Sequence, residues 1–270
     1  MSATANPIHA ALTWDLVAPG YAETLVQHFE FYSAESLRWA GLGAGARVLD
    51  VATGPGTLAL QACRVVGEVE ALDFSEKMIE ALRARAAGLG VSNLRAVQGD
   101  GHALPYEDGS FDGAFSMFGV MMFEDRAKAL GELRRVLRPG GTLVVSSWLP
   151  MDEVPMIQTV FEGLYEALPQ LPKGDPRGPW SDPETLRAEL SEAGFEAEVR
   201  RLDHVWVSES LEAFWDTMRR SFAPLVLLEH RMGAGFGAVA GVIQARLLAK
   251  HGPGEVRMNM PAWLARGVAR

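Results

Sequence analysis

An alternation of apolar and amphipathic segments between residues 45 and 148 constrains the fold of this chain more than any other feature. Short apolar runs such as RVLDVA and TLVVSSW alternate with segments of helical periodicity such as SEKMIEALRARAAGLG. Such an alternation predicts a parallel sheet covered by helices on both faces and joined by right-handed crossovers. Runs that are apolar on both faces, such as TLVVSSW, are typical of buried parallel strands. The fold class is therefore predicted to be α/β.

The regular alternation ends after Trp148. Residues 163–183 are rich in Pro and Gly and predict a loop or partial lid. Residues 196–208 alternate as a single strand does, and residues 209–250 are mostly helical with an interruption at RMGAGFGAVAG. Residues 255–270 predict a last strand or hairpin arm. We expect the helices of 209–250 to form either a lid over a pocket or the interface of a homodimer.

Composition and charge restrict the class of protein. The chain has 270 residues, of which 48% are hydrophobic and 22% charged, as expected for one large domain or one domain with a cap. The formal net charge of −9 argues against a nucleic-acid partner, which needs clustered Lys and Arg. The single cysteine, Cys63, excludes an internal disulfide, and we expect no metal site. The N-terminus lacks a secretory pattern and no apolar run reaches the ~18 residues of a membrane span, so we expect a cytoplasmic chain.

The stretch VLDVATGPGTLAL contains the pattern G-x-G-x-x-A at Gly54, Gly56 and Ala59. The pattern follows a predicted strand, opens a predicted helix, and is followed by Asp73 at the end of the next strand. Glycines at such a turn let the backbone approach a ligand closely. An acid at the neighbouring strand end can accept hydrogen bonds from a ribose diol. The context favours an adenosine-type cofactor over a simple strand–helix turn.

Two further acids indicate which cofactor is bound. Asp50 lies four residues before Gly54, where its charge disfavours a pyrophosphate and suits an ammonium or sulfonium group. Asp100, in QGDG, follows the third strand, where a carboxylate can accept from the exocyclic amine of adenine. Acids at the ends of three adjacent strands suit S-adenosylmethionine. An NAD-dependent oxidoreductase, which the glycine pattern alone would also fit, is the alternative.

Four segments in order resemble the successive motifs of class I S-adenosylmethionine-dependent methyltransferases. They are most similar to the branch that contains ubiquinone/menaquinone-type and many other small-molecule methyltransferases. The resemblance is good over residues 10–150 and loose elsewhere. It implies a Rossmann-like, doubly wound, seven-stranded and mostly parallel sheet with an antiparallel last strand and helical cap insertions. The four segments are VLDVATGPGTLAL, ALDFSEKMIEAL, VQGDGHALPYEDGSFDGAFSMFGVMMFED and ELRRVLRPGGTLVVSSW.

The resemblance also implies a domain plan and a set of cofactor contacts. The plan is a single domain over residues 1–270, with an N-terminal helical cap (1–44), a cofactor-binding core (45–150) and a substrate-side half (151–270). S-adenosylhomocysteine would be the product. The implied contacts are Asp50, Ala52, Thr53, Gly54 and Gly56 along the methionine part; Asp73 at the ribose; Phe74 and Met78 against the adenine; Asp100, Gly101 and His102 at the adenine edge; Ser116, Met117 and Phe118 beside the sulfonium; and Tyr21 over the cofactor.

Three residues depart from the family's usual motifs. Ala52 stands where Gly is more usual, and Thr53 stands where Cys or Ser is frequent. Both side chains are small, so the expectation of cofactor binding is unchanged. His102 stands where Glu or Gln is frequent, and we expect a contact dominated by the backbone there.

Methyl transfer is an in-line displacement that relies on proximity and orientation, and a base is needed only when the acceptor must lose a proton first. No residue spacing identifies such a base. His28 and Asp125 are weakly preferred because they lie in segments expected near the pocket mouth. The other candidates are His204, His230, Tyr165 and Glu124.

The segment FSMFGVMMF at the end of the fourth strand predicts an apolar pocket. It lacks the Asn/Asp-Pro-Pro-aromatic motif of enzymes that methylate the amino groups of bases. We therefore expect a methyltransferase acting on an O or C atom of an apolar or aromatic small molecule. A non-methylating S-adenosylmethionine-binding relative is a second alternative, because no base is identified.

Overall fold

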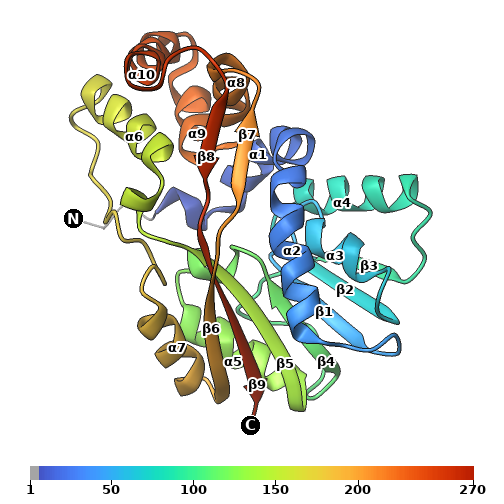
Figure 1. The fold of residues 1–270 in the computed structure, drawn as a ribbon. Coiled ribbons are helices and arrows are strands. Elements are labelled where there is room, and N and C mark those ends of the chain that lie inside the picture. Colours follow the sequence, from blue (N-terminus) through green and yellow to red (C-terminus); the bar gives the residue numbers. More distant parts are fainter. Residues whose placement is uncertain (1–5) are drawn as a thin grey trace, which may run out of the picture.

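A seven-stranded sheet forms the centre of the larger of two lobes (Figure 1). The computed structural model describes residues 6–270, so residues 1–5 of the predicted N-terminal cap lie outside the described residues. The strand order is β3-β2-β1-β4-β5-β9-β6. The first five strands run parallel, and β9 runs antiparallel to both β5 and β6, which confirms the predicted sheet. The strands are β1 (Arg47–Val51), β2 (Glu68–Asp73), β3 (Leu94–Gln98), β4 (Phe111–Ser116), β5 (Leu137–Trp148), β6 (Phe195–Leu202) and β9 (Ala262–Ala269).

Helices cover both faces of this sheet because alternate strand residues point into two separate cores. On β1, Leu49 faces the core under α5 and α7, whereas Val48 faces the core under α2, α3 and α4. Polar side chains cap the N-termini of three of these helices: Ser75 at α4, Asp125 at α5 and Asp182 at α7. The helices are α2 (Val26–Ala40), α3 (Thr57–Ala62), α4 (Glu76–Gly88), α5 (Arg126–Val136) and α7 (Pro183–Glu192).

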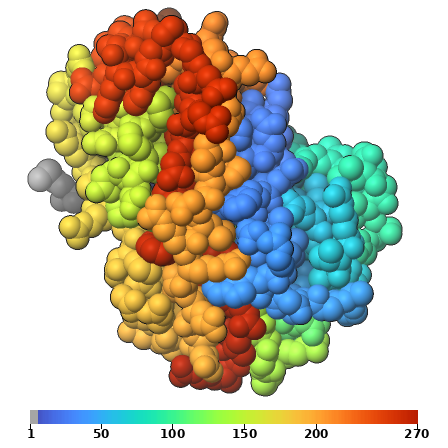
Figure 2. Space-filling model, in the orientation of Figure 1, coloured from blue at the N-terminus to red at the C-terminus, as the bar shows by residue number. Residues whose placement is uncertain are grey.

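The second lobe is a helical cap with a core of its own, here called the cap lobe. Figure 2 shows its C-terminal helices, coloured orange to red, beside the yellow-green α6 in the upper part of the molecule. Helix α1 (Ala11–Thr24) packs on α8 and α9 of this lobe and also on α4, so it bridges the two lobes. The cap lobe contains α6 (Pro155–Ala167), α8 (Leu211–Ser221), α9 (Ala223–Met232), α10 (Phe236–His251) and the antiparallel pair β7 (Val205–Ser208) and β8 (Val256–Asn259); short 3-10 turns are η1 (Pro7–His9), η2 (Val120–Met122), η3 (Met151–Glu153) and η4 (Gly233–Gly235).

Two predictions for the C-terminal strands were wrong in the same way. Residues 196–208 form two strands, β6 and β7, that belong to different sheets. Residues 255–270 likewise divide into β8 and β9. The chain crosses between the lobes at both breaks, and the N–H of Met260 donates to the carbonyl of His204 at 2.7 Å, which ties the two crossings together.

The predicted loop at 163–183 is partly helical, because α6 continues to Ala167. A Cβ atom at Gly163 would lie 2.9 Å from the Cα atom of Ile243, so α6 and α10 pack backbone to backbone there. Helix α5 ends at Val136, and strand β5 begins at Leu137, so the Pro-Gly-Gly segment at 139–141 lies within the strand.

Among residues 6–270, one helical stretch, Ala223–His251, is long and apolar enough by length and composition to cross a membrane, with a mean hydropathy of 1.4. Only 22% of its most apolar window is buried. Length and composition alone do not establish a span. In the fold this stretch bends at Gly233 (φ 55°), and α10 packs into the cap lobe through Ile243 and Leu247.

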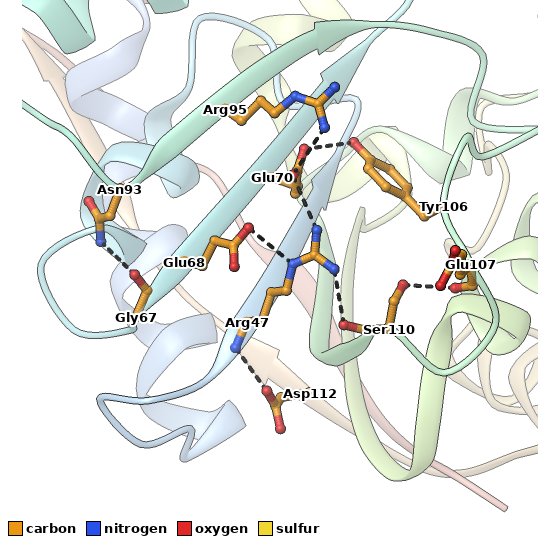
Figure 3. Close-up of polar contacts among 10 residues, drawn as sticks. All are labelled: Arg47, Gly67, Glu68, Glu70, Asn93, Arg95, Tyr106, Glu107, Ser110 and Asp112. Atoms are coloured by element: carbon orange, nitrogen blue, oxygen red, sulfur yellow. Dashed lines mark hydrogen bonds and ion pairs between the residues drawn. The ribbon is translucent and has the colours of Figure 1, made fainter.

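A buried carboxylate on β2 joins the three strands β1, β2 and β3 (Figure 3). Glu70 on β2 is 2% exposed, and its Oε1 atom accepts a hydrogen bond from Arg47 on β1 at 3.3 Å. The same oxygen lies 3.5 Å from the Nη1 atom of Arg95 on β3, and Oε2 accepts from the hydroxyl of Tyr106 at 3.3 Å. The network fixes β2 between its neighbours, and β2 ends in Asp73.

We expect Glu70→Ala to lower the free energy of unfolding by about 2–3 kcal/mol, because it leaves Arg47 and Tyr106 without their buried acceptor. Urea unfolding followed by circular dichroism measures the change. Glu68→Ala is the matched control: Glu68 pairs with the Nε atom of Arg47 at 3.2 Å but is exposed, so its loss should cost less than about 1 kcal/mol. Equal losses in the two variants would contradict the role of burial.

Candidate active site

Two buried acids hold the glycine loop at the carboxyl end of the sheet. Asp50 is the penultimate residue of β1, is 2% exposed, and accepts a hydrogen bond from the Thr53 hydroxyl at 2.7 Å. Asp73 ends β2, and its two oxygens accept from the N–H groups of Gly54 at 2.8 Å and Ser75 at 2.9 Å. The loop after β1 is therefore anchored at both of its sides before any ligand is present.

The loop adopts left-handed backbone conformations at three positions. Ala52 (φ 56°), Gly54 (φ 55°) and Gly56 (φ 80°) all have positive φ values, which glycine adopts freely and alanine only with strain. A Cβ atom at Gly56 would overlap the side chain of Leu82 on α4. At Gly54 a Cβ atom would meet only the Met78 sulfur, at 4.0 Å. Gly56 therefore serves packing, whereas Gly54 leaves open backbone that a ligand can approach.

A cavity of about 40 Å³ opens over this loop. It brings together six of the predicted cofactor contacts: Tyr21, Asp50, Ala52, Thr53, Gly54 and Met117. Sequence reasoning missed Phe29 and Ser33 of α2 because residues on a distant helix give no local signal of sharing a cavity. The other lining residues are Pro55, Thr57 and Leu58.

The predicted adenine edge has a polar pair and an unpaired nitrogen. Asp100 accepts from the His102 N–H at 2.8 Å, and the same oxygen lies 2.8 Å from His102 Nδ1. The Nε2 atom of His102 is buried without a hydrogen-bond partner, although its ring packs against Phe123 with the centroids 4.8 Å apart. Gly101 lies so close to the Phe123 ring that a Cβ atom would not fit. A buried, unpaired ring nitrogen beside this edge fits a polar ligand.

Three further predicted contacts, Ser116, Phe74 and Phe118, are not among the residues that line this cavity. Ser116 is fully buried and accepts from the N–H of Val120 at 3.1 Å. Phe74 is half-buried, and its carbonyl accepts from Gln98 at 3.2 Å. Phe118 is also half-buried and stacks on Trp148.

Helix α1 covers the site. The carboxylate of Asp15 accepts from the Ser75 hydroxyl at 2.6 Å and from the Lys77 N–H at 3.2 Å. Met78, the predicted adenine neighbour, is buried against Val17 and Ala18 of α1. The resemblance predicted a helical cap over residues 1–44, but the sequence did not locate this helix, because Pro19 lies inside it. The spacing of its apolar residues was nevertheless a helical signal: Trp14, Val17, Ala18 and Tyr21.

Neither weakly preferred base lines the cavity. Asp125 is exposed and caps α5, where its side chain accepts from the Lys128 N–H at 2.9 Å. His28 stacks on Trp206 with the ring centroids 4.0 Å apart, and burial, with His204 nearby, lowers the pKa of His28 to about 4. Within residues 6–270, no three His, Cys, Asp or Glu side chains are grouped to hold a metal ion.

Comparisons with known proteins place this chain in a family. A family described as "Methyltransferase domain" matches residues 48–141. The demethylmenaquinone methyltransferase of Thermus thermophilus is 38% identical over 165 residues, which cover 55% of this chain and 74% of that protein. The chain belongs to the class I S-adenosylmethionine-dependent methyltransferases. S-adenosylmethionine is the cofactor of this methyltransferase family, and the anchored loop, the open backbone at Gly54 and the unpaired His102 nitrogen fit it.

A second relative and a solved structure resemble other extents of this chain. An uncharacterised protein of Mycobacterium tuberculosis is 42% identical over 109 residues. The matched segment spans 40% of this chain and 39% of that relative. The solved structure of the [4+2]-cyclase SpnF has a TM-score of 0.64 over 96% of this chain and 94% of the cyclase, at 20% identity. That second likeness concerns the fold alone.

Burial raises the pKa of Asp50 to about 7 and that of Asp73 to about 6, from an ordinary value of 3.8. Between pH 3.8 and about 7, these two acids therefore hold more protons in the folded methyltransferase than in the unfolded chain. These two acids should make the free energy of unfolding fall as the pH rises from about 4 to about 7, whereas the lowered pKa of His28 contributes in the opposite direction between about 4 and 6.5. Urea unfolding at a series of pH values measures this slope, and Asp50→Asn should reduce it.

Asp182→Asn is the control for this titration. Asp182 is an exposed helix cap whose pKa is lowered by its hydrogen bonds to Thr185, so its contribution to the pH dependence lies below about pH 4. The slope between pH 4 and 7 should not change in Asp182→Asn. A slope that Asp50→Asn also leaves unchanged would contradict the raised pKa of Asp50.

Proposed function

We propose that this protein transfers the methyl group of S-adenosylmethionine to an O or C atom of an apolar or aromatic small molecule. One observation carries the proposal. The same cavity is bordered by the acid-anchored loop, with Asp50 and Gly54, and by apolar side chains of other elements, Phe29 and Met117. A cofactor site and an acceptor site that share one cavity are what a direct transfer requires.

The acids divide the cofactor between them. Asp50, which lies on the cavity wall, suits the ammonium of the methionine part, because its carboxylate is desolvated and has one donor, Thr53, on one oxygen. Asp73 suits the ribose diol, because each of its oxygens has one backbone donor and retains acceptor capacity. The pair Asp100 and His102 suits the polar edge of the adenine.

An aromatic cluster where the two lobes meet, formed by Phe29, Phe118 and Trp148, suits a flat, apolar acceptor. Phe118 stacks on Trp148 with centroids 3.7 Å apart and an interplanar angle of 14°. Phe29 meets both rings edge to face, at 5.4 Å and 5.8 Å. Aromatic rings prefer stacked and edge-to-face neighbours, so this cluster favours an aromatic acceptor. The relative from Thermus is named for a quinone, demethylmenaquinone, and we propose a quinol-type ring as the acceptor class.

The residues around the cavity bind, orient and exclude water, and none of them has to exchange a proton for transfer to an acceptor that is already nucleophilic. Bound S-adenosylmethionine supplies a methyl group activated by its sulfonium. The anchored loop keeps the cofactor side fixed, Tyr21 and Phe29 shield it from water, and the aromatic cluster positions the acceptor. Orientation of this kind supplies about 7–11 kcal/mol of barrier reduction in favourable cases.

We expect Asp73→Asn to weaken S-adenosylhomocysteine binding by about tenfold or more, because an amide offers one oxygen where the carboxylate offers two charged ones. Isothermal titration calorimetry measures the affinity. Asp112→Asn is the matched control, since Asp112 also accepts a backbone N–H, from Arg47 at 2.8 Å, but near the amino ends of the strands. Failure of the wild-type chain to bind S-adenosylhomocysteine at millimolar concentration would refute the proposed function.

We expect His28→Gln and Asp125→Asn each to keep the rate constant of methyl transfer within about tenfold, because neither side chain lines the cavity. Loss of a general base would instead lower the rate constant by about 10²–10⁴-fold. Mass spectrometry of 1,4-naphthoquinol incubated with S-adenosylmethionine measures the methylated product. A loss of 10²-fold or more in either variant would instead identify that residue as a base. Normal cofactor binding without methylation of any acceptor tried would favour the non-methylating relative.

A further inference from the structure

The turn after β4 holds a bulky residue in a conformation that favours glycine. Phe118 has a φ of 57°, in the left-handed region, where a branched or aromatic residue is strained. In the part of the chain that the structure describes, Ala52 and Trp180 are the other non-glycine residues with positive φ. Strain at two facing strand ends, β1 and β4, persists only where the surroundings enforce it.

Two buried serines enforce this conformation. The N–H of Phe118 donates to the hydroxyl of Ser146 on β5 at 2.9 Å, and the N–H of Val120 donates to the hydroxyl of Ser116 at 3.1 Å. Ser146 is 1% exposed and Ser116 is fully buried, so water cannot replace either acceptor. A buried N–H that loses its partner is costly, and the turn is therefore locked to β5.

The same turn interlocks with the cofactor loop. A Cβ atom at Gly119 would overlap the methyl group of Ala52 and lie 2.7 Å from the Ser116 hydroxyl. Met117, which precedes Phe118, lines the cavity over the loop. The position of Phe118 is thus set relative to the loop that carries the cofactor contacts, and not only relative to its own strand.

The ring of Phe118 packs against a residue that lines the cavity. It is half-buried, stacks on Trp148, and receives the edges of Phe29 and Tyr32 at centroid distances of 5.4 Å and 5.2 Å. Phe29 in turn lines the cavity. A displacement of about 1 Å in a ring that orients an acceptor can cost about 10²-fold in rate.

We propose that Phe118 orients the acceptor ring against the cofactor, and that Ser146 is the positioning residue that holds Phe118 in its strained conformation. This inference rests on the proposed function, because it concerns the acceptor side of the same site. Acceptor recognition then depends on the turn after β4, whose geometry is fixed by a side chain of the neighbouring strand β5.

The test compares Ser146→Ala with Ser147→Ala. Ser147 is its buried neighbour on β5, and the Ser147 hydroxyl donates to the Pro179 carbonyl at 2.9 Å, away from the turn. The probe is 1,4-naphthoquinone, titrated by calorimetry into protein saturated with S-adenosylhomocysteine. We expect Ser146→Ala to weaken probe binding by about tenfold and to leave S-adenosylhomocysteine affinity within about twofold, whereas Ser147→Ala changes neither.

Kinetics with 1,4-naphthoquinol give a second readout that a merely structural role would not move. Ser146→Ala should raise the KM for the quinol and lower kcat, with the KM for S-adenosylmethionine unchanged. Phe118→Leu, which keeps an apolar side chain without a flat face, should reproduce this pattern and covers the case in which Ser146→Ala does not fold.

The outcomes separate this inference from the proposed function. Unchanged probe binding in both Ser146→Ala and Phe118→Leu, or an equal loss in Ser147→Ala, would overturn the inference alone. Wild-type protein that binds S-adenosylhomocysteine but not the naphthoquinone would overturn the inference and the aromatic acceptor class together. Wild-type protein that binds no S-adenosylhomocysteine would instead overturn the proposed function.

Discussion

The carboxylate of Asp73 is the contact on which the rest of the site depends. One of its oxygens fixes the Gly54 N–H after β1, and the other fixes the Ser75 N–H after β2. Ser75 then caps α4 and donates its hydroxyl hydrogen to Asp15 of α1. A single buried side chain thereby sets the relation between two turns, one helix start and the covering helix. The backbone donors offset the desolvation that raises its pKa to about 6.

Backbone strain is concentrated where the two halves of the site meet. Ala52 and Phe118 both have positive φ values, and they follow adjacent parallel strands, β1 and β4. Gly119 separates them and leaves no room for a side chain of its own. Strained residues of this kind persist where the surrounding structure determines them. At Phe118 this is done by the backbone N–H groups of Phe118 and Val120, which donate to Ser146 and Ser116. The loop after β1 and the turn after β4 therefore form one rigid unit.

The sequence predicted the parallel part of the sheet and the glycine loop because both depend on local patterns. The apolar runs of β1 and β5 and the Gly54–Gly56 turn are visible in short windows. The first crossing between the lobes was missed because the two-residue alternation of 196–208 continues through the break without a Gly or Pro to mark it. The second was missed although Pro261 stands at its break. The aromatic cluster was missed as a unit, because Phe29, Phe118 and Trp148 meet only through the tertiary fold.

The cavity is small, and its two walls are held by different contacts. A cavity of about 40 Å³ is far smaller than the roughly 300–1,000 Å³ of small-molecule sites, so it can hold only part of a ligand of that size. The loop wall is held by buried hydrogen bonds and by its interlock with the turn after β4. Helix α1 is held to α4 by two hydrogen bonds to Asp15, from Ser75 and Lys77, and by packing of Met78. Gly20 lets α1 contact the Arg220 carbonyl of α8 so closely that a Cβ atom would overlap it, so α1 is tied to the cap lobe as well as to the sheet.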